Sequence, residues 1–320
     1  MGCRFPDAEY DSSFNFTNTL IFSSPGHALN NIDVSFCCAW TDKWRSAGGL
    51  CALPKYIKFE DFSWNQLPKG LGIRYTAEQA FRTHEFRQKS LHGLTIEWVD
   101  FTGSDFSGFT LGFFEYCNFE GANFKDAMRL LPMGGRRPGH IGSKFGFENC
   151  HNLTNEQLEQ THFWKRGDVT GMVLENLNLD DWDFSNKDLS QVSFAWSSVR
   201  NAKFENAHIR NTSITQGIAI SSPATLTSSS PTSLTVEQLQ QTRSWKEKQI
   251  IGCIIYGVDF KNQDLSGFDF RSTAFILCTF GNANLVGADV TGAMMTFNKG
   301  ETISLTEEQL RSLQFLHKSH

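Results

Sequence analysis

Apolar residues recur at every fifth position in three long stretches of the chain. The stretches cover residues 91–116, 169–214 and 250–295, and after Tyr116 the frame slips by three positions and resumes at Phe119. An α-helix cannot hold such a stripe, because five residues turn it by about 500°. A flat strand cannot hold it either, because odd spacings alternate between its two faces. The pattern therefore predicts a solenoid that turns a corner every five residues and buries its inward side chains by stacking its coils.

A phrase that predicts the start of a helix precedes each stretch. It reads LTNEQLEQ from Leu153 and LTVEQLQQ from Leu234, with a weaker copy, YTAEQAFR, from Tyr75 and a fourth, LTEEQLRS, from Leu305. In every copy a Thr stands at an N-cap position and a Gln follows three residues later, so that the two form a capping box. Each phrase predicts a helix of about three turns, which is short enough to need packing against the rest of the fold.

The five-residue units resemble the repeats of the pentapeptide-repeat family. The best matches are CNFEG and ANFKD (117–126), AKFEN and AHIRN (202–211), and ANLVG and ADVTG (283–292). The resemblance implies a mainly β fold, a right-handed quadrilateral β-helix with four five-residue faces per coil, here interrupted by short α-helices. It also implies a small inward position two residues before each central apolar residue. We therefore interpret Cys117, Cys253 and Cys278 as packing groups at this position. The same position is occupied elsewhere by Ala122, Ala202, Ala207, Ala283, Ala288 and Ala293.

The repeats divide the chain into three regions. Residues 1–74 are expected to form an irregular N-terminal capping segment with a degenerate coil near 61–67. The β-helix follows over residues 75–296 in three super-repeats, 75–128, 153–214 and 234–296. Residues 305–320 are expected to form a C-terminal capping helix, because the last coil of a solenoid otherwise exposes unpaired strand edges.

Two coils depart from the repeat at equivalent places. The departures are Trp182 with Lys187 and, in the next super-repeat, Gln263 with Phe268. We expect a wide or distorted corner at each place, with the preceding helix packed against it through Trp164 or Trp245.

Composition and charge exclude several classes of function. The net charge of −5 and the pI near 6 give no overall positive footprint for direct binding to nucleic acid. No stretch approaches eighteen apolar residues, so no membrane span is expected, and the N-terminal residues lack the apolar core of a signal peptide. None of the eight cysteines forms a CxxC motif. These features favour reduced thiols and a cytoplasmic location.

Three groups of residues could be read as chemical sites, and each has a plainer interpretation. The loop 129–144 is rich in Gly and basic residues, but it matches no phosphate-binding motif, and Arg136, Arg137, His140 and Lys144 are interpreted as a solvated loop between super-repeats. The irregular spacing of Cys37, Cys38 and Cys51 with His27 fits structural zinc badly. Cys150 and His151 are neighbours in sequence, which does not make them a nucleophile pair. We expect no catalytic, cofactor-binding or metal-binding residues.

Acidic residues gather in two stretches of the repeats. They are Glu97, Asp100, Asp105, Glu115 and Glu120, and then Asp168, Glu175, Asp180, Asp181, Asp183 and Asp188. Many of the Asp residues directly precede a central apolar residue, where Asp or Asn serves the turn by hydrogen bonding to the backbone. Structure therefore explains most of this acidity.

A non-enzymatic scaffold that presents a rigid surface to another protein is the leading hypothesis, because the fold offers surface and the sequence offers no catalytic constellation. The resemblance leaves two alternatives open: a DNA mimic that modulates a type II topoisomerase, motivated by the acidic stretches, and an effector-like protein acting in another cell. The sequence does not identify the partner or the oligomeric state.

Overall fold

The computed structural model describes residues 3–4, 21–22, 59–67, 74–130, 144–215 and 234–295. The chain divides into two compact units. The first comprises residues 1–90 with 98–100, and the second comprises 91–97 with 101–320. The capping helix expected at 305–320 lies outside the described residues, as do most of the N-terminal segment and most of the loop 129–144.

The first unit is helical where it is described, apart from β1 (Cys3–Arg4) and β2 (Ile21–Phe22), which pair in parallel. Two 3₁₀ helices, η2 (Phe59–Asp61) and η3 (Trp64–Gln66), are followed by α1 (Ala77–Arg82) and α2 (His84–Arg87). The Glu85 carboxylate accepts hydrogen bonds from the Trp64 backbone N–H, at 2.8 Å, and from the Ser63 hydroxyl. Trp64 is buried against Tyr75 and Phe86. Residues 59–67, where a degenerate coil was expected, therefore form two 3₁₀ turns.

Short parallel strands organise the second unit. They are β3 (Thr95–Glu97), β4 (Phe113–Glu115), β5 (Gly146–Glu148), β6 (Val173–Glu175), β7 (Ser213–Ile214), β8 (Ile254–Tyr256), β9 (Ala274–Ile276) and β10 (Met294–Met295). Strands β3 to β6 pair as one four-stranded sheet, and β7 to β10 pair as another. Single bridges from Ser193 to Val173 and to Ser213 connect the two sheets, so one parallel ladder runs from β3 to β10.

Three further series of bridges recur along the same coils. Between residues 168 and 214 they pair Asp168 with Asp188, Asn178 with Ser198 and Asp183 with Lys203. Each bridge joins residues twenty positions apart, and successive series are offset by five. Each coil in this range thus spans about twenty residues, which is four times the apolar period of five.

The inward positions are confirmed across the second and third stretches. Every fifth residue from Val169 to Ile214 and from Ile250 to Met295 is at most 6% exposed. The small positions are buried as well, including Cys117, Cys253 and Cys278. Aromatic rings stack one coil above another: Phe184 lies on Phe204 with ring centroids 5.4 Å apart, and other pairs repeat this arrangement (Phe101–Phe119, Phe106–Phe124, Phe114–Phe147 and Phe260–Phe280).

In the first stretch, the five-residue register of inward residues shifts earlier in the chain than the sequence suggested. Tyr116 was expected inside, but it is 36% exposed and has a positive φ of 54°. The slip occurs between Leu111 and Phe114, which are both buried. The corner is tight at Gly112, where an added Cβ would lie 2.2 Å from the carbonyl oxygen of Leu91. A shortened coil is possible there because glycine has no side chain to accommodate.

Each helical phrase within the described ranges forms two short helices rather than one. The second unit contains α3 (Asn155–Glu159) with α4 (His162–Lys165), and α5 (Val236–Gln241) with α6 (Arg243–Lys246). The predicted capping boxes are present at Thr154 and Thr235. The break lies at a second N-cap Thr, where the Thr161 hydroxyl accepts from the Trp164 N–H and donates to the Leu158 carbonyl. The expected single helix of about three turns is therefore wrong, because a second cap restarts the helix after its first turns.

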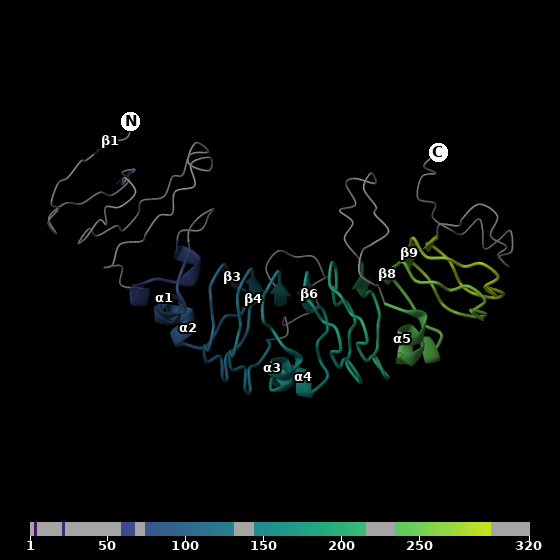
Figure 1. Ribbon diagram of the computed structural model, residues 1–320, viewed down its shortest axis with the longest axis horizontal. Coiled ribbons are helices and arrows are strands. Elements are labelled where there is room, and N and C mark those ends of the chain that lie inside the picture. Colours follow the sequence, from purple (N-terminus) through teal and green to yellow (C-terminus); the bar gives the residue numbers. More distant parts are fainter. Residues whose placement is uncertain are drawn as a thin grey trace. The chain divides into compact units, whose positions relative to one another are not determined.

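A helix pair interrupts the coil between β5 and β6, and bridges form at His151 before the pair and at Asp168 after it. In Figure 1, β4, β6 and β8 lie along one side of the coils, and α3 and α4 lie along the opposite side. The Gln157 amide, beyond its capping role, donates to the carbonyl oxygens of Phe119 and Ala122 at 2.7 and 3.0 Å. The Gln238 amide donates equivalently to Val199 and Ala202, both at 2.9 Å. Each pair is thus fastened to the coil before it.

The unusual corners receive these helices as expected. Trp164 packs edge-on to Trp182 at 6.1 Å and lies beneath the Lys187 ammonium at 5.4 Å. In the next super-repeat Trp245 packs edge-on to Phe268 at 4.9 Å. Trp182 is equivalent to Gln263, and Phe268 is equivalent to Lys187. The aromatic residue that packs against the helix therefore stands at a different corner in each super-repeat.

Candidate interaction surface

The strand ladder presents one continuous set of outward side chains in the second unit. In β3, β6, β8 and β9 the central residue is buried and both flanking residues are partly exposed. The flanking residues therefore define a surface, here called the ladder face, that extends from β3 to β10.

Four glutamates lie in register at the β3–β6 end of the ladder face. Pairing places Glu97 beside Glu115, Glu115 beside Glu148, and Glu148 beside Glu175. Neighbouring strands lie about 4.8 Å apart, so these carboxylates form a closely spaced row. Burial, followed by the charges of Glu148 and Glu97, raises the pKa of Glu115. Burial and the charge of Glu175 likewise raise the pKa of Glu148.

The negative charge of the glutamate row is only partly neutralised by its neighbours. The Lys144 ammonium lies 3.8 Å from the Glu148 carboxylate and 4.8 Å from the centre of the Phe113 ring. Its charge lowers the pKa of both Glu115 and Glu148, but the net shift of each remains upward. At the other end of the row, the Ser193 hydroxyl donates to the Glu175 carboxylate.

The β8–β10 end of the ladder face is apolar. Its partly exposed residues are Ile254, Tyr256, Ala274, Ile276 and Met294, and Leu277 at the adjoining corner is 49% exposed. A cluster of this kind on the outside of a solenoid differs from scattered surface apolar residues, which are ordinary.

The corner that follows the ladder strands holds bulky residues in the left-handed backbone region. Tyr116, Trp196 and Leu277 have φ values of 54°, 66° and 51°, and Trp98, which follows β3 in the sequence, has 60°. At the other described positions with positive φ the chain uses Gly, Asn, Asp, Ser, Gln or Lys. Bulky side chains are disfavoured in this region, so their concentration at this corner is a conformational cost that the fold itself does not require. Trp196 and Leu277 are also 48% and 49% exposed.

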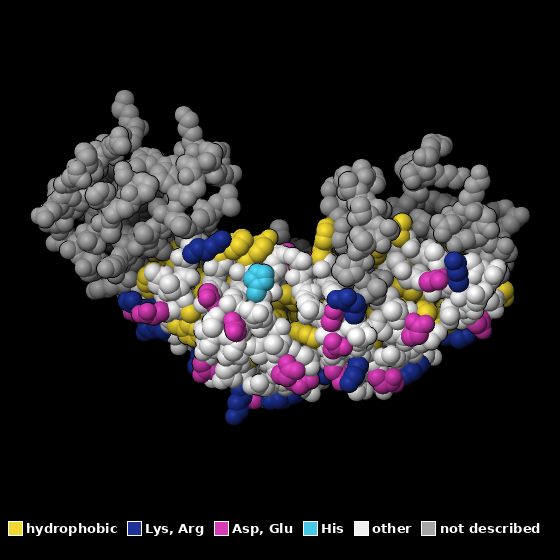
Figure 2. Space-filling model, viewed as in Figure 1, with side chains coloured by type: hydrophobic (Ala, Val, Ile, Leu, Met, Phe, Trp, Pro, Cys, Tyr) yellow, Lys and Arg dark blue, Asp and Glu magenta, His cyan; other side chains and the backbone are white. Residues whose placement is uncertain are grey.

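Several Asp residues of the repeats serve the turns, among them Asp105, Asp183 and Asp188 of the two acidic stretches. A carboxylate or amide oxygen accepts from the N–H two residues later, as Asp105 does from Ser107 at 2.9 Å and Asp183 from Ser185 at 2.8 Å. The same bond recurs at Asp188, Asp259, Asp264, Asp269 and Asp289. On the face shown in Figure 2, acidic side chains are interspersed with Lys and Arg rather than merged into one stripe.

The chemical candidates from the sequence do not assemble in the described part of the chain. Arg136, Arg137 and His140 of the basic loop lie outside it, as do Cys37, Cys38, Cys51 and His27. Next to the loop, Arg129 is largely buried, with its guanidinium 3.6 Å from the Asp168 carboxylate and 5.1 Å from the centre of the Phe145 ring. Burial lowers the pKa of Arg129.

The Cys150 thiol is a packing group. Its sulfur contacts the carbonyl oxygens of Phe114 and Glu148 at 3.5 and 3.4 Å. Burial raises the pKa of the Cys150 thiol to about 12, so it is protonated at neutral pH and is not an activated nucleophile.

The described ranges contain neither a metal-binding cluster nor a helix suited to a membrane. No group of three His, Cys, Asp or Glu side chains there is arranged to hold a metal ion. None of the helices in those ranges has the length and apolar character needed to cross a bilayer.

Sequence reasoning missed the ladder face as a unit. Glu97, Glu115 and Glu175 were noticed as acidic, but Glu148 was not grouped with them. The available signal was the recurrence of Glu directly after an inward residue, in TIE, FFE, GFE and VLE.

Comparison with known proteins supports the assignment of the repeats. The model of the family described as pentapeptide repeats matches residues 253–292 in eight copies. Residues 253–292 of the chain are therefore similar to pentapeptide repeats. A comparison with curated proteins found no match.

Two solved structures show a distant likeness to this chain. One is HetL, described as involved in heterocyst differentiation regulation, from the cyanobacterium Nostoc sp. strain PCC 7120. It is 17% identical over 64% of this chain, with a TM-score of 0.16, and the match spans 65% of HetL. Full-length QnrB1, a plasmid-mediated fluoroquinolone resistance protein, is 12% identical over 66% of this chain and 94% of its own, with a TM-score of 0.22. These TM-scores are low, so the assignment rests on the match to the repeats.

Proposed function

We propose that this pentapeptide-repeat protein is a non-enzymatic scaffold that binds another protein through the ladder face. In this proposal the coils close into a right-handed quadrilateral β-helix, and the helix pairs are insertions that interrupt individual coils. The partner would contact the side that is free of helix pairs, where the strands lie in one register.

The observation that carries the proposal is the set of exposed bulky residues at the ladder corner. Asn or Gly at Trp196 and Leu277 would suit the backbone better, as Asn149 and Asn176 do at the same corner. A residue in the left-handed region costs roughly 1–3 kcal/mol when its side chain is unsuited to it. Exposed aromatic groups such as Trp are frequent anchors in protein interfaces. Contact with a partner would offset the conformational cost at Trp196, and the neighbouring Leu277 would add buried apolar area.

The chemistry of the ladder face indicates the kind of partner. The glutamate row would attract Lys or Arg side chains, and close pairing would offset the repulsion that raises the pKa of Glu115 and Glu148. The apolar end would accept aliphatic or aromatic side chains. A protein with a basic segment followed by an apolar one would match both ends.

The test replaces the anchors by residues that suit the backbone. Trp196→Asn with Leu277→Asn should leave the free energy of unfolding equal or higher, because Asn tolerates positive φ, while capture of the partner by the purified protein falls at least about tenfold. The control is Gln191→Asn, which introduces the same residue at another corner where φ is 62°. Equal capture by the double variant and the control would refute the ladder face as the binding surface.

A second candidate follows from the glutamate row, whose closely spaced carboxylates also suit a mimic of the phosphates of duplex DNA. The target would be a type II topoisomerase, as the family resemblance suggested. Supercoiling by purified gyrase, measured with and without micromolar protein, tests it, and Glu115→Gln with Glu148→Gln should abolish any inhibition. An unchanged supercoiling rate would dismiss this candidate.

A further inference from the structure

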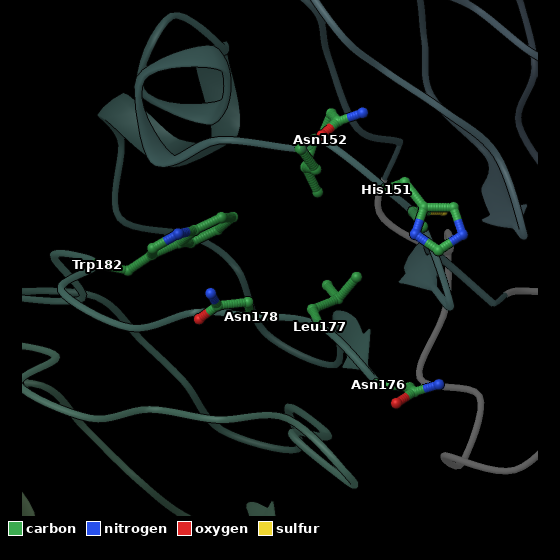
Figure 3. A pocket seen from close by; sticks show the side chains of 8 residues that line it. His151, Asn152, Asn176, Leu177, Asn178 and Trp182 are labelled. Atoms are coloured by element: carbon green, nitrogen blue, oxygen red, sulfur yellow. The ribbon is translucent and has the colours of Figure 1, made fainter.

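A small cavity opens in the second unit where α3 begins. It has a volume of about 230 Å³ and is lined by Cys150, His151, Asn152, Leu153, Asn176, Leu177, Asn178 and Trp182. In Figure 3, Asn152 and His151 lie on one side of the cavity, Trp182 and Asn178 on the other, and Leu177 between them.

The cavity coincides with a missing rung in one of the bridge series. Asn118 pairs with His151, and Asn178 pairs with Ser198, but within the described ranges His151 and Asn178 do not pair. The chain turns away at Asn152, where φ is 55°, and enters the helix at the Thr154 cap. Two coils that are paired elsewhere are therefore separated at this face.

The separation leaves backbone groups without their ladder partners. One coil earlier, the Phe119 N–H donates to the His151 carbonyl at 3.0 Å, and the His151 N–H donates to the Cys117 carbonyl at 2.8 Å. In the same register Asn152 would donate to Asn178, and Asn178 would donate to Cys150. Neither bond forms, and these N–H and C=O groups make no other hydrogen bond within the described part of the chain.

The lining is polar and uncharged. It offers the amides of three asparagines and the His151 imidazole, with Leu177 and Trp182 as apolar walls. No carboxylate, ammonium or guanidinium group lines it. Two of the asparagines are fixed by bonds to neighbours: Asn152 donates to the Asn118 side chain at 2.9 Å, and Asn176 donates to the Asn149 side chain. Donors and acceptors side by side in an uncharged setting suit a ligand that has both, such as an amide.

Size separates two kinds of amide ligand. Small-molecule sites generally have volumes of about 300–1,000 Å³, and this cavity is smaller. One or two residues of an extended chain would fit, and their backbone could supply the missing rung in the manner of an added strand.

We propose that the break between His151 and Asn178 binds a short, uncharged, extended segment of a partner protein. The segment's C=O accepts from the Asn178 or Asn152 N–H, its N–H donates to the Asn178 or Cys150 C=O, and its side chain lies toward Trp182. The inference deepens the proposed function by adding a second contact for the partner, and it rests on that function in taking the ligand to be a protein.

The direct probe is a capped dipeptide, acetyl-alanyl-alanine N-methylamide, added to the full chain and followed by backbone amide NMR. Saturable shifts of the Asn152 and Asn178 amides are expected, with a dissociation constant in the millimolar range. The analogue methylated on its amide nitrogens lacks donors and should bind at least about tenfold more weakly, as the loss of one or two hydrogen bonds implies. This assay needs no natural partner, so it can fail or succeed independently of the scaffold test.

Asn176→Trp provides the blocking variant, because the adjoining coil already carries Trp196 at the equivalent corner. Its matched control is Asn149→Trp, which breaks the same Asn176–Asn149 hydrogen bond at a residue that does not line the cavity. The proposal expects Asn176→Trp to remove the shifts and Asn149→Trp to keep them. It is overturned if the dipeptide gives no saturable shift, if both variants respond alike, or if acetamide binds as tightly as the dipeptide, which would indicate a site for small amides.

Discussion

The side-chain amide of Gln238 donates a hydrogen bond of 2.9 Å to the carbonyl oxygen of Val199, a residue 39 positions earlier in the chain. The same Gln completes the capping box of α5 by accepting from the Thr235 N–H. One side chain thus starts the helix and fastens it to the coil beside it, and its two ends have opposite hydrogen-bonding roles.

That division of roles predicts a specific effect of Gln238→Glu. A carboxylate keeps the capping acceptor but places an oxygen against two carbonyl oxygens, so the free energy of unfolding should fall by about 2–3 kcal/mol. Urea unfolding followed by circular dichroism measures it. The control is Gln79→Glu in α1, where the half-exposed side chain serves as the capping acceptor for the Thr76 N–H. Similar changes at the two sites would show that fastening contributes little.

The stacked interior predicts a large cost for removing one ring. Phe270 is 1% exposed, stacks on Phe268 at 5.2 Å and meets Phe275 edge-on at the same distance. Phe270→Ala should lower the free energy of unfolding by about 3–5 kcal/mol, the usual range for buried aromatic residues. Val286→Ala, at a side chain that is 59% exposed, should change it by no more than about 0.5 kcal/mol. A loss below about 1 kcal/mol for Phe270→Ala would be incompatible with the inward position.

The apolar period of five predicted the interior residues, because which side chains point inward depends only on local spacing along the chain. Tyr116 was misplaced because an apolar residue on the frame does not show where the corner is shortened, and the decisive feature is the missing side chain of Gly112. The break in each helix could have been predicted, since Thr161 repeats, seven residues after Thr154, the N-cap that opens the phrase. The glutamate row could not, because insertions of unequal length separate its members along the chain and only strand pairing brings Glu115 beside Glu148.

The glutamate row predicts a stability that falls as pH rises. The pKa of Glu115 is raised above its usual value of 4.5, chiefly by burial and then by Glu148, so the folded state binds protons more tightly than the unfolded state in that window. The destabilisation caused by ionised Glu115 is therefore absent below the pKa of the unfolded state and complete above the pKa of the folded state. Glu115→Gln should therefore stabilise the protein at pH 7, by less than about 1 kcal/mol because the group is mostly solvated, and have no effect near pH 3.

Asp269 gives the opposite sign and serves as the control. The Arg271 guanidinium donates to its carboxylate at 2.7 Å and holds the pKa of Asp269 below its usual value of 3.8. The stabilisation is present above the unfolded pKa and lost as the pH falls through the folded pKa. Asp269→Asn should destabilise at pH 7 and lose that effect in acid. If both variants shift the urea midpoint in the same direction at pH 7, the electrostatic account of the ladder face is wrong.

The buried cysteines predict a clear pattern of labelling. Burial raises the pKa of the Cys278 thiol to about 12 and that of the Cys253 thiol to about 11. Iodoacetamide at pH 8 should leave Cys117, Cys150, Cys253 and Cys278 unmodified in the native protein and modify all four in urea, because only the exposed thiolate reacts. Mass spectrometry of the digested protein resolves each site, and rapid native modification of any of the four would contradict its interior position.

The fourth helical phrase leads to a prediction about residues outside the described ranges. LTEEQL follows Met295, an inward ladder residue, much as LTVEQL follows Ile214, the inward residue of β7. The phrase therefore predicts another short helix, and we propose that it covers the exposed edge of β10. Deleting residues 304–320 should lower the melting temperature and promote end-to-end association, since an uncovered edge is a template for pairing. Sedimentation and thermal unfolding measure both effects, and the single substitution Gln309→Glu, the counterpart of Gln238→Glu, should reproduce part of the loss of stability while leaving the chain length unchanged. A truncated protein that stays monomeric with an unchanged melting temperature would instead assign the segment to partner binding.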